Sequence, residues 1–254
     1  MEFTNKTVIV TGASRGMGYA AAKAFAQNGA NVVLVSRKKE DVERAAKEFG
    51  LPESRYLAVG ADISKSEGVR SYIDAAMDKF GRIDAVFSNA GVSGTDKLLV
   101  DVTDEEFDRC IDTNLKSTFY MLKGVLPIMS AQRSGSIIVN SALGALRVLP
   151  GMAEYAAAKS GILSLMRSAA VENANRNVRV NAIVPGTINT SMVKNFEVAQ
   201  GITDENRDEV LAKLLPMGRY GTPEELADLV LFLASDKSTY INGVAIRIDG
   251  ASGT

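Results

Sequence analysis

The sequence contains no histidine, and Cys110 is its only cysteine. A Ser-His-Asp triad or a Cys-His pair needs an imidazole to carry the proton, so neither kind of active site is possible. Zinc and non-haem iron sites usually rely on histidine or on several cysteines, and we therefore expect no metal site. A single cysteine also excludes a disulfide within the chain. Acid–base chemistry is left to Asp, Glu, Lys, Tyr and one thiol, and we expect that thiol to be an inert core group.

The sequence also lacks an excess of charge and a long apolar run. Its 29 Lys and Arg residues balance 30 Asp and Glu residues, so no positive field would gather the phosphates of nucleic acids or lipids. No run of about 18 consecutive apolar residues predicts a transmembrane helix, and the start, MEFTNKTVIVTG, does not have the pattern of a signal peptide. These absences predict a cytoplasmic protein that binds neither nucleic acid nor membranes.

Short runs rich in β-branched residues alternate with longer helical patterns. We expect strands at 7–10, 31–35, 56–59, 83–87, 136–140, 178–183 and 244–248, and helices at about 17–28, 39–49, 66–80, 104–131, 153–175 and 223–234. Most of the strand runs are apolar throughout, which is typical of strands covered on both faces. This order predicts a single α/β domain over 1–254. Its fold would be Rossmann-type and doubly wound, with helices on both faces of a seven-stranded, mostly parallel sheet.

Two helical segments, 107–129 and 154–166, are small or apolar nearly all round. A helix without a polar face needs cover on every side, and the sheet covers only one of them. A partner subunit is the expected cover, and burial within the same chain is the alternative. We therefore predict a homo-oligomer.

A glycine-rich turn follows the first expected strand and leads into a helix. Its glycines would allow a tight turn, a close approach of the backbone to a pyrophosphate, and close packing of helix on strand. The helix N-terminus adds free N–H groups and a positive dipole for phosphates. The predicted dinucleotide contacts in this turn are Gly12, Ser14, Arg15, Gly16, Met17 and Gly18.

The end of the second expected strand predicts which dinucleotide binds. An acidic residue about 20 positions beyond the glycines would bind the ribose 2′-hydroxyl of NAD. Ser36 stands there instead, and Arg37 follows it. Arg37 and Arg15 together suit a 2′-phosphate through charge-assisted hydrogen bonds. The expected cofactor is therefore NADP(H).

The glycine spacing G-x-x-x-G-x-G, with Thr11 before it, resembles the short-chain dehydrogenase/reductase family. The resemblance runs from about residue 5 to residue 250. It is carried further by Ala-Asp-Ile at 61–63, Ser-Asn-Ala-Gly at 88–91, Asn114, Ser141, the Y-x-x-x-K motif at 155–159, Pro-Gly-Thr-Ile-Asn-Thr at 185–190 and Asp-Gly at 249–250. Three departures are that Ser88 replaces the first Asn of an N-N-A-G motif, that Ser141 lies one residue farther from Tyr155 than in many members, and that Ala251 stands where a second Gly is common.

Tyr155 and Lys159 are four residues apart in an alanine-rich segment, so both side chains share one helix face. A nearby ammonium stabilises a phenolate and lowers the pKa of a tyrosine, which suits it to acid–base catalysis. The resemblance implies that Lys159 also holds the nicotinamide ribose, that Ser141 binds the substrate oxygen, and that Asn114 holds a water in a proton relay. It further implies cofactor contacts from Asp62, Ile63, Asn89, Ala90, Gly91, Tyr155, Lys159, Pro185, Gly186, Ile188 and Thr190. A homotetramer is the assembly it favours, with a dimer as the alternative.

Substrate choice is expected to depend on a mobile amphipathic lid at about 188–217 and on the loops near the predicted site. The candidate pocket residues are Ser93, Leu143, Met152, Met192 and Phe196. This apolar wall favours reduction of a ketone or an aldehyde with an apolar body. A 3-oxoacyl group on acyl carrier protein is one alternative, with Arg133 and Arg176 similar in position to the basic patch of that subgroup. A sugar or polyol dehydrogenase is another. A protein that binds NADP(H) without catalysis is the alternative of a different class.

Overall fold

The computed structural model describes residues 1–148, 150–191, 193, 197 and 201–254. One sheet of seven strands has the order β3-β2-β1-β4-β5-β6-β7, and each neighbouring pair is parallel. The strands are β1 (Thr7–Thr11), β2 (Asn31–Ser36), β3 (Tyr56–Gly60), β4 (Ala85–Ser88), β5 (Gly135–Asn140), β6 (Val178–Pro185) and β7 (Ala245–Ile248). The predicted doubly wound, Rossmann-type sheet is confirmed.

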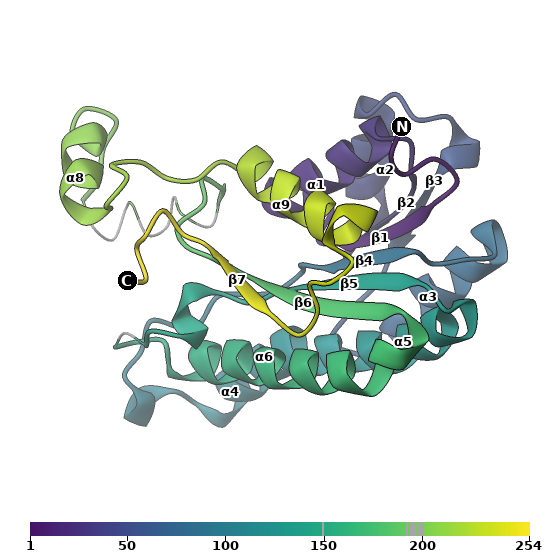
Figure 1. Cartoon of the computed structure of the whole chain (residues 1–254). Helices are drawn as coiled ribbons and strands as arrows, with labels where there is room; N and C mark the ends of the chain where they lie inside the picture. The colour runs from purple at the N-terminus through teal and green to yellow at the C-terminus, as the bar shows by residue number, and fades with distance from the viewer. Residues whose placement is uncertain (149, 192, 194–196, 198–200) are drawn as a thin grey trace.

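Helices cover both faces of this sheet (Figure 1). On one face lie α1 (Gly16–Gln27), α2 (Lys39–Glu48) and α9 (Pro223–Ala234). On the other lie α3 (Ser66–Phe80), α4 (Asp104–Ile111), α5 (Ser117–Gln132) and α6 (Ala153–Asn173), while α8 (Arg207–Leu214) stands apart from the layers. None of the helices among the described residues has the length and apolarity needed to cross a membrane.

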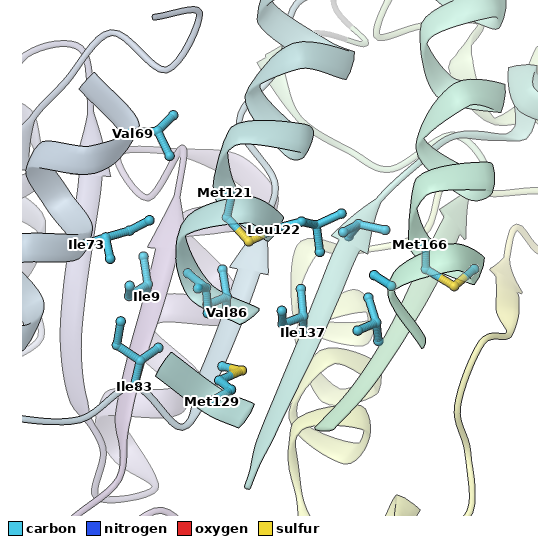
Figure 2. Packing of buried hydrophobic residues seen from close by; sticks show 14 of the residues in the cluster. Ile9, Val69, Ile73, Ile83, Val86, Met121, Leu122, Met129, Ile137 and Met166 are labelled. Atoms are coloured by element: carbon cyan, nitrogen blue, oxygen red, sulfur yellow. The ribbon is translucent and has the colours of Figure 1, made fainter. Parts of the chain in front are cut away.

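The strand residues alternate between two hydrophobic cores because successive side chains point to opposite faces. Ile9 belongs to the core under α3, α5 and α6, while Val8 and Val10 belong to the core under α1, α2 and α9. Figure 2 shows Ile9 with Val86 and Ile137 from the neighbouring strands, facing the helices of the first core. Burial on both faces explains why the strand runs are apolar throughout.

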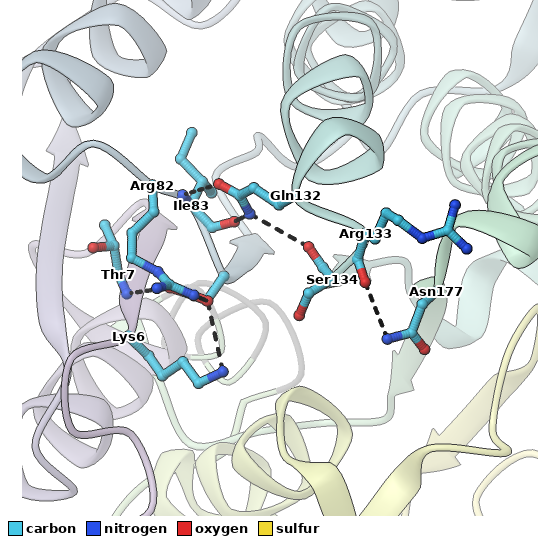
Figure 3. A network of polar contacts seen from close by, with 9 residues as sticks. Lys6, Thr7, Arg82, Ile83, Gln132, Arg133, Ser134 and Asn177 are labelled. Carbon is cyan, nitrogen blue, oxygen red and sulfur yellow. Dashed lines mark hydrogen bonds and ion pairs between the residues drawn. The ribbon is translucent and has the colours of Figure 1, made fainter.

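Most expected elements begin or end one or two residues away from the observed boundaries, and two of the differences have a physical cause. The fourth strand starts at Ala85 rather than at Ile83, whose backbone N–H and C=O are both bonded by the Gln132 side chain at the end of α5 (Figure 3). The expected helix 104–131 is interrupted by a π-helical turn, Asp112–Lys116, between α4 and α5. Such turns insert an extra residue into a helix and are often found at functional sites.

A polar network fastens the edge of the sheet where the strands begin (Figure 3). The buried Asp84 carboxylate accepts from the Thr7 N–H at 2.8 Å and from the Arg82 guanidinium at 2.6 and 2.8 Å. Nearby, the Asn177 amide donates to the backbone carbonyl of Arg133 at 3.2 Å. The predicted catalytic residues lie at the opposite edge, where the strands end.

Candidate active site at the carboxyl ends of the strands

Most of the predicted site residues follow the ends of strands β1 to β6, so the parallel sheet brings them to one edge, and Asn114, Tyr155 and Lys159 come from helical segments. From β1 to β3 the chain adds strands on one side of β1, and from β4 onward it adds them on the other side. The direction of strand addition therefore reverses between β1 and β4. In open α/β sheets, ligands bind in the crevice outside such a switch point.

Three positions of the turn between β1 and α1 favour glycine, because of their backbone conformation or because a side chain would collide with neighbouring atoms. Gly12 has a φ of +70°, and a Cβ at Gly18 would lie 2.2 Å from the Gly12 carbonyl oxygen. A Cβ at Gly16, whose φ is +57°, would lie 3.2 Å from the methyl group of Thr190. Arg15 is the N-cap residue of α1 and its side chain makes no capping hydrogen bond. This close-packed backbone and uncapped helix start fit the pyrophosphate of a dinucleotide.

Hydrogen bonds join this turn to the strand ends beside it. The Thr11 hydroxyl accepts the N–H groups of Asn89 and Ala90, both at 3.0 Å, and the Asn89 amide donates to the Thr11 carbonyl at 3.1 Å. The Asn140 amide in turn donates to Asn89 Oδ1 at 3.0 Å. Lys159 is the last member of this series of hydrogen bonds, because its Nζ donates to the Asn140 carbonyl at 2.8 Å. The glycine turn and the predicted catalytic lysine therefore belong to one connected network.

Tyr155 and Lys159 lie together at the start of α6, with Lys159 Nζ 5.6 Å from the centre of the Tyr155 ring. The pKa of the Tyr155 phenol is not lowered, contrary to the expectation from the neighbouring ammonium: burial raises it to about 12, with a smaller upward effect from the Cys110 thiol. Burial lowers the pKa of Lys159 to about 8, and the same thiol opposes that shift. At neutral pH the phenol is therefore protonated and the neighbouring amine is still largely charged. This pair can supply a proton and stabilise the phenolate that remains.

The structure places Ser141 beside Lys159, but its hydroxyl points to the helix backbone. Ser141 Oγ donates to the Lys159 carbonyl oxygen at 2.9 Å, and the residue is 2% exposed. Its backbone N–H bonds Ile183 in β6, which continues the strand pairing by one residue. The hydroxyl can reach a substrate only if it leaves the Lys159 carbonyl.

Asn114 lies in the π-helical turn and holds the segment that follows β4. Its amide oxygen accepts the Val92 N–H at 3.1 Å, and its amide nitrogen donates to the Val92 carbonyl at 3.1 Å. Its own backbone carbonyl accepts the Thr118 hydroxyl at 3.0 Å. A Cβ at Gly91 would lie 2.4 Å from Asn114 Oδ1 and 3.7 Å from Lys159 Nζ, so all three residues meet at one point.

The residues predicted to bind the adenosine end lie at the ends of β2 and β3. The Ser36 hydroxyl donates to the Lys38 carbonyl at 2.6 Å, while the Arg37 side chain is exposed. Asp62 accepts hydrogen bonds from the backbone and hydroxyl of Ser64, which lower the pKa of its carboxyl group, and the positive charge of Arg37 contributes to that shift. Ile63 is buried in the core beside Asp62. Arg37 and Asp62 are therefore neighbours at this end of the crevice.

The loop after β6 lies over the glycine turn. Pro185 ends the strand, and a Cβ at Gly186 would lie 2.8 Å from the Asp249 Cα, so this loop passes close to the end of β7. Ile188 forms an isolated bridge to Gly221 and its side chain is buried. Thr190 lies against the glycine turn, as the close approach to Gly16 shows.

The predicted pocket residues are only partly brought together. A Cβ at Gly144 would contact both Met152 and the Tyr155 ring, so Met152 lies beside the site, and Ser93 is exposed in the segment after β4. Leu143 packs against Gly253 at the end of the chain. Met192 and Phe196 lie outside the described residues.

A cavity of about 210 Å³ borders the loop after β6. It is formed by Thr187 and Ile188, by the end of β7 and by the connection from α8 to α9. None of the predicted catalytic residues lines it.

Two site residues escaped the sequence analysis. Glu154 is fully buried next to Tyr155 and binds Thr95, which is 59 positions away in the chain. The glutamate precedes a recognised motif, but nothing in the sequence pairs it with that threonine, because the contact exists only once α6 packs beside the segment after β4.

Comparisons with known proteins agree with this geometry. A family model described as enoyl-(acyl carrier protein) reductase matches residues 12–251. The 3-oxoacyl-(acyl-carrier-protein) reductase FabG of Chlamydia muridarum is 40% identical over 247 residues, which cover 97% of this chain and 96% of that protein. Levodione reductase of Leifsonia aquatica is 37% identical over 253 residues, covering 98% and 94%. A crystal structure of levodione reductase superimposes with a TM-score of 0.93 at 35% identity, covering 99% of this chain and 98% of the other.

Proposed function

The chain belongs to the short-chain dehydrogenase/reductase family, and we propose that this oxidoreductase uses NADP(H) to reduce a ketone or an aldehyde to an alcohol. The observation that carries the proposal is the hydrogen-bond network that joins Lys159 to the glycine turn, with Tyr155 beside Lys159 on the same helix. A phenol with a neighbouring ammonium is what proton delivery to a developing alkoxide requires when the chain has no histidine.

The cofactor fits the residues of the crevice. The glycines of the β1–α1 turn would hold the pyrophosphate, Arg15 and Arg37 the 2′-phosphate, and Asp62 with Ile63 the adenine ring. Asn89, Ala90, Gly91, Tyr155 and Lys159 would line the nicotinamide ribose, and the loop with Pro185, Gly186, Ile188 and Thr190 would orient the nicotinamide. When bound, the nicotinamide supplies the hydride. The exposed arginine side chain at position 37 and the absence of an acid at position 36 support NADP(H) over NAD(H).

Residues of the protein would then deliver the proton to the substrate oxygen. Tyr155 donates its phenolic proton to the substrate oxygen, and Lys159 stabilises the phenolate that forms. Asn114 holds the segment after β4 in place and, through a water, would return a proton to this pair. Ser141 would bind the substrate oxygen once its hydroxyl leaves the Lys159 carbonyl.

The substrate class is proposed from the surroundings of Tyr155. Met152, which lies beside the Tyr155 ring, favours an apolar body next to the carbonyl group. One relative with a matching structure is a levodione reductase, which supports carbonyl reduction. The predicted lid at 188–217 would cover the site of a single catalytic domain. In its described part, Ile202 and Leu211 pack with Tyr220 in a small core, while 192, 194–196 and 198–200 lie outside the described residues.

The assembly and the compartment are part of the same proposal. Phe107 in the charged helix α4 and Phe119 in the largely apolar helix α5 remain 41% and 44% exposed in the single chain. A second copy of the chain would cover them, and we expect a homotetramer, or otherwise a dimer, in the cytoplasm. Sedimentation velocity at micromolar concentration tests the assembly, and a monomer would refute it.

Reduction of 3-oxoacyl groups on acyl carrier protein is the second candidate, because one relative is a reductase of that name. Arg133 and Arg176 are exposed, but they precede β5 and β6 and so lie at the sheet edge opposite to Tyr155. Within a single chain, Arg133 and Arg176 therefore do not lie at the entrance of the candidate active site. A sugar or polyol dehydrogenase would need a more polar wall than Met152 provides.

The test is the nicotinamide absorbance over time with NADPH or NADH and a panel of ketones, aldehydes, ketosugars and 3-oxoacyl thioesters. We expect fastest consumption with NADPH and an apolar ketone or aldehyde. Tyr155→Phe should abolish turnover while the variant still binds NADPH. A wild type that binds NADPH and reduces none of these compounds would instead favour a non-catalytic binding protein.

A further inference from the structure

Glu154 directly precedes Tyr155 in α6, and its side chain is fully buried, with 0% exposure. Its Oε1 atom accepts the backbone N–H of Thr95 at 2.7 Å and the Thr95 hydroxyl at 2.9 Å. Among the residues that the structure describes, no donor reaches its Oε2 atom. A buried carboxylate with one oxygen unsatisfied lowers the stability of a fold. Packing alone therefore gives no reason for a glutamate at this position.

The contact fixes one end of the short segment 92–96, which follows β4 and runs beside α6. Asn114 fixes the other end, because its side-chain amide binds both the N–H and the C=O of Val92. Glu154 binds the segment at Thr95. Two side chains from different elements thus hold five consecutive residues in one position.

The middle of this segment lies directly against the proposed proton donor. A Cβ at Gly94 would be 3.3 Å from the Tyr155 Cβ and 3.0 Å from Glu154 Oε1. Ser93, next to it, is exposed and is one of the residues expected to meet the substrate. A shift of the segment would change the space over Tyr155 without moving the glycine turn.

We propose that Glu154 is a positioning residue for carbonyl reduction, which through Thr95 clamps segment 92–96 against Tyr155 and sets the shape of the substrate entrance. The inference rests on the proposed function, because it assigns the clamp to the same site. The clamp touches none of the residues assigned to the pyrophosphate or the 2′-phosphate. It therefore acts mainly on the KM and the choice of carbonyl substrate.

The experiment compares Glu154→Ala, Glu154→Gln and Thr95→Val with the wild type in steady-state reduction of a small and a bulky ketone. Loss of the two charge-assisted hydrogen bonds in Glu154→Ala should raise KM about 10-fold, with kcat within about threefold. Glu154→Gln keeps an acceptor oxygen and should restore KM to within about twofold of the wild type. Thr95→Val removes only the hydroxyl bond and should raise KM by an intermediate factor. The matched control is Glu172→Ala, an exposed glutamate of the same helix.

The outcomes separate the clamp from a merely structural role and from the proposed function. A structural role would lower the melting temperature and the active fraction, and so kcat, while KM and the ratio between the two ketones stayed constant. That result, or a KM within twofold of the wild type in both Glu154→Ala and Thr95→Val, overturns the clamp alone. If Glu154→Ala does not fold, Thr95→Val and Glu154→Gln decide. A wild type that binds NADPH and reduces no carbonyl overturns the proposed function and the clamp together.

Discussion

Thr11 offers a direct test of the network that ties the glycine turn to the neighbouring strand ends. Thr11→Val exchanges the hydroxyl for a methyl group of similar size at a residue that is 2% exposed. It removes the acceptor of two backbone N–H groups, those of Asn89 and Ala90, each bonded at 3.0 Å. A buried donor without a partner costs roughly 1–3 kcal/mol. Because Asn89 and Ala90 are half-buried and water reaches them in part, we expect a loss of about 2–3 kcal/mol, the lower part of the range for two such donors.

The assay is urea unfolding at a fixed protein concentration, since assembly adds to apparent stability. Thr11→Ser is the matched control, because it keeps the acceptor oxygen and loses only one buried methyl group, worth roughly 1 kcal/mol. We also expect weaker NADPH binding in Thr11→Val, since Gly12 follows directly. The reasoning fails if Thr11→Val is no less stable than Thr11→Ser, because the two N–H bonds would then contribute nothing.

Three further predictions concern the cofactor and the catalytic pair. Arg37→Ala should lower the NADPH-to-NADH ratio of kcat/KM by about 10-fold or more, as expected for the loss of a charge-assisted bond, and an unchanged ratio would remove Arg37 from the 2′-phosphate site. Ser141→Ala should lower kcat if the hydroxyl turns toward the substrate, and a variant that loses stability at constant kcat would assign Ser141 to holding α6 instead. Lys159 has a pKa near 8 in the fold against 10.5 in the unfolded chain, so the unfolded state binds more protons between these values. Stability should therefore rise between pH 8 and 10 by up to about 1.4 kcal/mol per pH unit relative to Lys159→Met, and parallel pH curves would contradict the shift.

The strands and their order could be predicted because each strand is buried on both faces. Runs such as Val32 to Val35 are apolar throughout, and helices separate them at a spacing that only a parallel, doubly wound sheet accommodates. The boundaries depended on contacts that are distant in sequence. The sequence pattern predicts Ile83 to be a strand residue. In the structure, the side chain of Gln132, 49 positions away, hydrogen-bonds both its N–H and its C=O.

The candidate site was predictable in composition and less so in orientation. The motif with Tyr155 and Lys159 places two side chains on one helix face by local geometry. The direction of the Ser141 hydroxyl depends on the register of an extended chain, in which a shift of one residue moves a side chain to the opposite face. The π-helical turn around Asn114 and the bond from Glu154 to Thr95 need packed neighbours to exist, so a local pattern cannot reveal them.

The connected network also predicts that the cofactor turn and the proton-transfer pair respond to mutation together. Thr11, Asn89, Asn140 and Lys159 follow one another through hydrogen bonds of 2.8–3.1 Å that cross three adjacent strand ends. Residues in one network show coupling energies of roughly 0.5–3 kcal/mol, whereas independent sites add. A double-mutant cycle of Thr11→Val with Asn140→Ala should therefore be non-additive in the free energy of unfolding. The same cycle with Arg82→Ala, at the opposite edge of the sheet, should be additive. Additivity in both cycles would mean that Thr11 and the Asn140 side chain are neighbours in the network without sharing energy through it.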